Sequence, residues 1–377
     1  MPCPITYPII LTTTRTPQPA PAPEAPADLN VMSRVRAIAG LDAARGLHSL
    51  RGRENAYCAL LGTFAGITGL ALIAGPALGG AVTQGLSWQW VFWINIPIGL
   101  LLVALVRTQV AEGRAPVAAI DGWGAALLTL ASFGVAWALI QGHALGWTHL
   151  QVELSAAAGL VCMAGFVRHS RRAQAPMIPP RLFASGSLSW ALLASAMLYA
   201  PLYSLLFLLP QLLQTQGGSP LEVGLKLLPW TATLFVTAPF AGKLAARLGE
   251  RPVAVVGLLL QAAGLAGLGA LAGQGQPFWV LAPAMVVAGV GISAAMPALQ
   301  NAALSSVAPV DIGRASGVFN TVRFFAGFCG IALSTEVFVR LGGIASRRQV
   351  EGGFEAAVLL LAGLSVLGVV FAARLPV

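Results

Sequence analysis

The sequence predicts an all-α, polytopic membrane protein with about ten transmembrane helices. Of its 377 residues, 57% are hydrophobic and only 9% are charged, whereas a typical soluble domain is about 25% charged. The mean hydropathy is +0.79. The apolar residues form long unbroken runs, unlike the short alternating segments of a membrane β-barrel. This composition excludes an ordinary soluble enzyme, a disordered chain and a small disulfide-rich domain.

The N-terminal segment, residues 1–56, differs from the rest of the chain. Its first part is polar and rich in Pro and Ala, which is typical of disordered or polyproline-like segments. A run of basic residues then precedes the first long apolar segment: Arg34, Arg36, Arg45, Arg51 and Arg53. Such a run predicts a solvated or lipid-surface cytoplasmic segment.

Ten apolar segments follow, each close to the roughly 20 residues that cross a bilayer as a helix. They are predicted at about residues 57–81, 87–107, 122–142, 152–168, 187–210, 222–244, 252–273, 278–299, 316–340 and 354–373.

The positions of the cations predict how these spans are oriented. Lys or Arg follows the second, fourth, sixth, eighth and tenth spans, whereas the loops after the first, third, fifth and seventh contain neither. Because cytoplasmic loops of membrane proteins are enriched in cations, both termini are expected in the cytoplasm. Arg340, Arg347 and Arg348 depart from this pattern, since they fall in a loop predicted to lie outside.

The first span ends in closely spaced glycines and a proline. Proline bends a membrane helix, and glycine lets a neighbouring backbone approach closely. The spacing resembles the antiporter signature in the fifth helix of drug:proton antiporters of the major facilitator superfamily, with Ala71 in place of one expected glycine. The resemblance implies a gating helix that carries Gly62, Gly75, Pro76, Gly79 and Gly80.

Two further patterns resemble the same family. Residues 87–99, in which three tryptophans precede Asn95 and Pro97, resemble the sixth helix of its fourteen-helix branch. A second pattern resembles the family's short basic cytoplasmic loop, with departures at Ala246 and Glu250. It consists of Gly242, Arg247, Gly249 and Arg251.

The resemblance extends over roughly residues 54–374 and aligns the ten spans with helices five to fourteen of that branch. Residues 57–107 then correspond to the last two helices of the N-terminal bundle, 122–168 to two linker helices, and 187–373 to the C-terminal six-helix bundle. Residues 1–53 do not resemble helices one to four. We therefore expect a chain that lacks the first four helices of the family.

Polar residues within the spans are candidates for a transport pathway, because such groups are costly in lipid. Arg323 follows Asn320 by one helical turn, and is either a cavity-facing cation or an arginine that snorkels to the interface. Glu336 could carry a proton, but Arg340 lies four residues later, which favours a structural ion pair. The other candidates are Asn95, Gln211 and Gln214, although amides can also simply join helices.

Two simpler roles are predicted for residues near span ends. Asp121 is expected to cap the N-terminus of the third span, since an acidic side chain suits the positive end of a helix. The tryptophans are expected to anchor the protein at the membrane interface; they include Trp88, Trp90, Trp93, Trp147, Trp190 and Trp230.

The resemblance implies a multi-pass plasma-membrane transporter that exports hydrophobic or cationic drugs in exchange for protons, and so an antibiotic-resistance protein. Its expected partners are the lipid bilayer, a small-molecule substrate and protons. No nucleic acid, cofactor, metal or covalent chemistry is expected, so the chain is not predicted to be an enzyme. The competing hypothesis is a truncated, non-transporting membrane fragment or interaction scaffold, which the missing helices favour.

Overall fold

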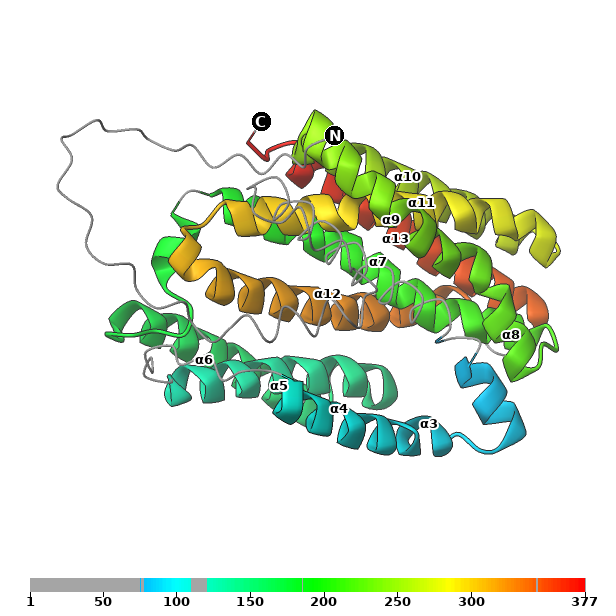
Figure 1. The fold of residues 1–377 in the computed structure, drawn as a ribbon. Coiled ribbons are helices and arrows are strands. Elements are labelled where there is room, and N and C mark those ends of the chain that lie inside the picture. Colours follow the sequence, from blue (N-terminus) through cyan, green and yellow to red (C-terminus); the bar gives the residue numbers. More distant parts are fainter. Residues whose placement is uncertain (1–74, 76–77, 110–120, 185, 344, 377) are drawn as a thin grey trace. The chain divides into compact units, whose positions relative to one another are not determined.

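The computed structural model describes residues 75, 78–109, 121–184, 186–343 and 345–376, and every regular element in these ranges is helical (Figure 1). The all-α prediction is thus confirmed. The predicted segment 1–56 and most of the first predicted span lie outside the described residues. The described residues divide into two compact units, one containing residues 87–109 and the other residues 78–86 and 121–376.

The smaller unit contains α3 (Trp90–Trp93) and α4 (Asn95–Gln109), which together form the predicted second span. Pro97 has no N–H that could donate a hydrogen bond to the carbonyl of Trp93. The helix is interrupted at Ile94, the residue after Trp93. The Asn95 side chain bridges the interruption, since its Nδ2 donates to the Val91 carbonyl at 2.9 Å.

In the larger unit, α5 (Gly122–Leu145) and α6 (Leu150–Arg172) form an antiparallel hairpin and lie side by side (Figure 1). The N-cap predicted at Asp121 is confirmed, because its Oδ1 accepts from the Gly124 N–H at 2.8 Å. This hydrogen bond satisfies one of the free donors in the first turn of α5.

The remaining helices form a bundle around α7 (Ser187–Thr215), which contacts α11, α12 and α13 (Figure 1). Over its apolar stretch, 67% of α7 is buried. The short helices are η1 (Pro180–Phe183), α8 (Pro220–Lys226) and η2 (Pro309–Asp311). The long helices are α9 (Leu228–Leu248), α10 (Glu250–Gly273), α11 (Phe278–Ser305), α12 (Ile312–Leu341) and α13 (Arg347–Ala372).

Within the described residues, eight helices are long and apolar enough to cross a membrane, which confirms a polytopic protein. One prediction needs correction. The single span expected at 222–244 is two helices, α8 and α9, that meet at Leu227. Pro229 lacks the N–H that would continue the hydrogen-bond ladder, so the helix is interrupted there.

Trp230 is a second correction. It was expected at the membrane interface, but its side chain is completely buried. The break before α9 places Trp230 against α11, where its indole lies close to Gly289. Trp190, in contrast, is partly exposed, and the Arg374 guanidinium lies 4.6 Å from its ring centroid.

Two of the three cations that depart from the orientation pattern have carboxylate partners. Arg340 pairs with Glu336 on α12, and Arg347 Nε lies 2.7 Å from Glu351 Oε1 on α13. Each pair spans one helical turn. The two carboxylates offset two of the three positive charges of this loop.

Candidate functional site

Arg323 lies in the middle of a group of aromatic side chains. Its Nε donates to the Tyr203 hydroxyl at 3.2 Å, and its guanidinium lies 4.7 Å from the ring centroid of Tyr199 and 5.4 Å from that of Phe324. We call these four residues the Arg323 cluster. Aromatic faces stabilise a cation that has lost part of its water, so the cluster holds a positive charge away from the helix end.

Close packing of α7 on α12 brings the cluster together. A Cβ atom at Gly330 would lie 2.6 Å from the Ala200 carbonyl oxygen, so only glycine fits this approach. Tyr199 and Tyr203 are four residues apart and therefore share one face of α7. Tyr199 is fully buried, and its hydroxyl has no hydrogen-bond partner in the described part of the chain.

An apolar cavity of about 300 Å³ lies between α7, α12 and α13, and none of the four residues of the Arg323 cluster lines it. Its lining includes Ala200 and Val322, which are chain neighbours of Tyr199 and Arg323. Among the described residues, none that lines this cavity is charged. The arrangement therefore combines an apolar space with one cation, an uncommitted hydroxyl and several aromatic faces.

The other predicted pathway residues are not part of this cluster. Asn320 is exposed, and its Nδ2 donates to the Ser316 carbonyl of its own helix at 3.0 Å. Gln211 and Gln214 are exposed near the C-terminal end of α7, about 12 Å or more beyond Tyr203 along the helix axis. Asn95 belongs to the smaller unit. Of the six predicted residues, the structure thus places only Arg323 in the cluster.

Glu336 forms the ion pair that its spacing from Arg340 favours. Its Oε1 also accepts from Trp147 Nε1 at 3.1 Å. Trp147 lies in the turn between α5 and α6, so this carboxylate links the helical hairpin to α12. These contacts support a structural role for Glu336.

Replacing Glu336 by Gln is accordingly expected to lower stability by less than about 1 kcal/mol, as for other partly exposed ion pairs. Thermal unfolding of the purified chain in detergent would measure the difference. A destabilisation of several kcal/mol, or loss of the folded protein, would contradict the role of an ordinary ion pair.

Two carboxylates at the opposite end of the hairpin and of α12 hold loops in place. Asp121 accepts from His169 Nε2 at 2.7 Å and from the Met177 N–H at 3.0 Å. Burial alone would raise the pKa of Asp121, but the hydrogen bonds from Gly124, Met177 and His169 outweigh it and lower the pKa. Sequence reasoning identified the cap but missed the His169 contact, because 48 residues separate the partners.

Asp311 is buried just before α12 and binds two arginines. Arg181 Nη2 and Arg314 Nη1 each lie 3.0 Å from its Oδ1. The hydrogen bond from Arg181 is the main reason why the pKa of Asp311 is lowered, and Arg314 adds to it against the opposing effect of burial. The pair with Arg181 fastens the loop before α7 to the start of α12.

We expect Asp311→Asn to lower the unfolding temperature at neutral pH. Because the folded pKa is lowered, this stabilisation is complete above the unfolded pKa of about 3.9 and disappears as the pH falls through the folded pKa. Unfolding measured from pH 3 to 7 should show a constant difference between variant and parent above about pH 5 and a shrinking one below about pH 4. A difference that is absent, or independent of pH, would contradict this role.

The predicted gating helix contacts the C-terminal bundle through the residues that the structure describes. Residues 78–85 are helical. A Cβ at Gly80 would lie 2.5 Å from the Pro220 carbonyl oxygen, and Gln84 Oε1 accepts from the Leu221 N–H at 3.2 Å. The close approach expected of the motif is thus present at Gly80. At Gly75 and Gly79 a Cβ would meet no atom within 4 Å, and Gly62 and Pro76 lie outside the described residues.

The predicted basic loop forms the turn between α9 and α10. Gly249 has a φ of 89°, which favours glycine. Gly242 and Arg247 are exposed. Within the described residues, no ion pair involves Arg247 or Arg251. This fits the departure at Ala246, which stands where the motif has an acidic residue.

The long apolar helices and the cation held between two of them define a polytopic helical membrane protein with a polar site inside its bundle. Comparison with known families identifies it further. The model of the Major Facilitator Superfamily matches residues 54–331 and 191–377. The chain therefore belongs to the Major Facilitator Superfamily.

Its relatives include resistance and export proteins. The chain is 34% identical over 282 residues to the tetracenomycin C resistance and export protein of Streptomyces glaucescens, covering 72% of this chain and 51% of that protein. It is 33% identical over 290 residues to the lincomycin resistance protein of Streptomyces lincolnensis, covering 74% and 57%. The multidrug resistance protein Stp of Mycobacterium tuberculosis is 27% identical, covering 72% and 51%. The chain thus spans about half the length of these relatives.

Proposed function

We propose that the chain is a transmembrane transporter that exports hydrophobic small molecules in exchange for protons. Family membership and the names of the relatives support export. The single observation that carries the proposal is the Arg323 cluster beside the apolar cavity, between α7 and α12. Proton coupling rests on family resemblance. The proposal involves no covalent chemistry, cofactor or nucleic acid.

The cluster narrows the class of substrate. Arg323 places a positive charge beside the cavity, and no carboxylate among the described residues lines that cavity. A cationic drug would therefore be repelled, whereas a neutral or anionic aromatic compound could stack on the tyrosines and approach the guanidinium. The Tyr199 hydroxyl, which has no partner among the described residues, could serve such a ligand. We therefore favour ring-containing, neutral or anionic substrates over the cationic drugs also expected from the resemblance.

The domain assignment follows the family. We propose that residues 57–107 are the last two helices of the first bundle, 122–168 two linker helices, and 187–373 the second bundle, in a plasma membrane with both termini in the cytoplasm. In this arrangement the contact of Gly80 with the start of α8 supports a gating role, because it joins the antiporter-motif helix to the second bundle.

Drug accumulation in cells tests the function. Cells that express the chain should accumulate less of a fluorescent polycyclic anion than cells with an empty vector. A protonophore should abolish this difference. Equal accumulation in both cell lines, with the chain present in the membrane, would overturn the proposal.

A further inference from the structure

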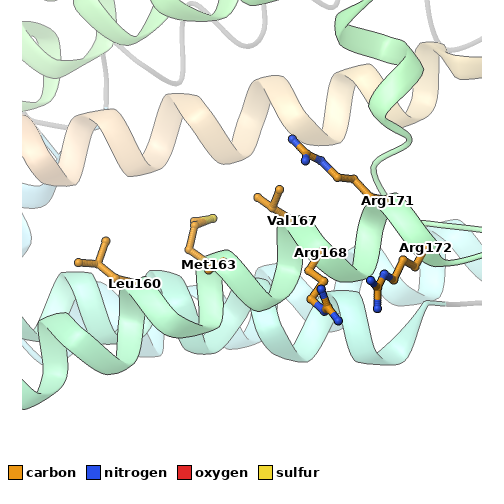
Figure 2. A pocket seen from close by; sticks show the side chains of 7 residues that line it. Leu160, Met163, Val167, Arg168, Arg171 and Arg172 are labelled. Carbon is orange, nitrogen blue, oxygen red and sulfur yellow. The ribbon is translucent and has the colours of Figure 1, made fainter.

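One face of α6 combines a row of apolar side chains with a group of arginines. Among the described residues, those that line a groove of about 620 Å³ all belong to this helix and include Leu160, Met163 and Val167. Figure 2 shows these three side chains in a row, with Arg168 and Arg172 on one side of the end of that row and Arg171 pointing to the other side. We call these six residues the α6 groove. It lies apart from the Arg323 cluster and the cavity beside it.

The arginines of the α6 groove have no acidic partner in the part of the chain that the structure describes. Within the described residues, no ion pair involves Arg168, Arg171 or Arg172. The carboxylate of Asp121, at the same end of the hairpin, is occupied by His169 and by the backbone of Gly124 and Met177. All three arginines are exposed. Three uncompensated cations within about 6 Å of helix axis favour an anion.

The apolar row indicates what kind of anion fits. Leu160 and Val167 are 65% and 42% exposed, and they lie about 10 Å apart along the helix axis. The hydrocarbon of one leaflet is about 15 Å deep, so the row can lie in lipid while the arginines reach the headgroup region. A soluble anion such as free phosphate would use the arginines but leave the apolar row without a function.

We propose that the α6 groove binds one anionic phospholipid, with the headgroup phosphate on Arg168 and Arg172, Arg171 adding positive charge from the other side of the helix, and an acyl chain along Leu160, Met163 and Val167. Guanidinium groups bind phosphate oxygens in charge-assisted pairs, and clustered cations at a membrane surface favour anionic lipids. Such a lipid would occupy the exposed face of the linker hairpin.

The test uses the full chain, purified and placed in nanodiscs of phosphatidylcholine to which phosphatidylglycerol with identical acyl chains is added. Lipid retained by the protein is measured by native mass spectrometry. We expect preferential retention of phosphatidylglycerol, weakened about fivefold by each of Arg168→Gln, Arg171→Gln and Arg172→Gln. Arg348→Gln is the matched control, because Arg348 is also exposed at a helix end and has no ion pair in the described part of the chain.

A second variant, Ala164→Trp, tests the apolar part by filling the groove while the arginines remain. It should also reduce retention of the lipid. Equal retention of both lipids, or an equal loss in Arg348→Gln, would overturn the proposal. Displacement of the lipid by millimolar inorganic phosphate, together with no effect of Ala164→Trp, would show a free-anion site and overturn the lipid assignment. Mass spectrometry that finds a polypeptide bound over the groove in place of the lipid would also overturn the lipid assignment.

Discussion

Arg323→Ala is expected to abolish export and to weaken binding of an aromatic anion by roughly tenfold or more, because a desolvated cation–aromatic contact is worth up to about 2 kcal/mol. The guanidinium is the only charged group in the Arg323 cluster, and it joins α12 to Tyr199 and Tyr203 on α7. Equilibrium binding to the purified chain and drug accumulation in cells would measure the two effects.

Arg374→Ala provides the matched control. Arg374 also lies over an aromatic ring, that of Trp190, but near the end of α13 and away from the cavity. It should leave binding and export close to those of the parent. Arg323→Lys keeps the charge but loses the planar stacking, and should retain only part of the binding. Unchanged binding in Arg323→Ala, or an equal loss in Arg374→Ala, would show that the cluster is not the substrate site.

Gly80→Val is expected to have the second largest effect. Even the first added carbon would lie 2.5 Å from the Pro220 carbonyl oxygen, so the motif helix must move away from α8. Such overpacking typically costs about 1–3 kcal/mol. Because this contact joins the motif helix to the second bundle, we also expect export to be lost. Thermal unfolding and drug accumulation would measure both.

The neighbouring glycine offers the control for this variant. Gly79→Val adds the same side chain one residue away, where a Cβ meets no atom within 4 Å. It should change neither stability nor export appreciably. Equal effects at the two positions would mean that helix propensity or a general property of the motif, rather than contact with Pro220, explains the result.

The features that sequence reasoning predicted well depend on local patterns. The apolar runs placed both ends of α10, the start of α11 and the end of α12 within two residues, because burial in lipid depends on the length of a run. The Asp121 cap and the ion pair of Glu336 with Arg340 were also predictable, since both partners lie within one helical turn.

The features that were missed depend on distant residues. Tyr203 lies 120 residues from Arg323, and Trp147 lies 189 residues from Glu336. No spacing rule connects such pairs, so the sequence suggested Arg323 as a candidate but not the tyrosines around it. The break between α8 and α9 had a local signal, Pro229. Its apolar surroundings masked that signal, and Trp230 was therefore predicted at the interface rather than in the core.

The most direct test of the proposed function is uptake by proteoliposomes that contain only the purified chain. A fluorescent polycyclic anion is added outside, and a pH gradient, acidic inside, is imposed. We predict uptake that follows the gradient, stops when the gradient is collapsed, and is absent in Arg323→Ala but present in Arg374→Ala. Uptake no faster than in protein-free liposomes, by a chain shown to be folded and inserted, would contradict the account.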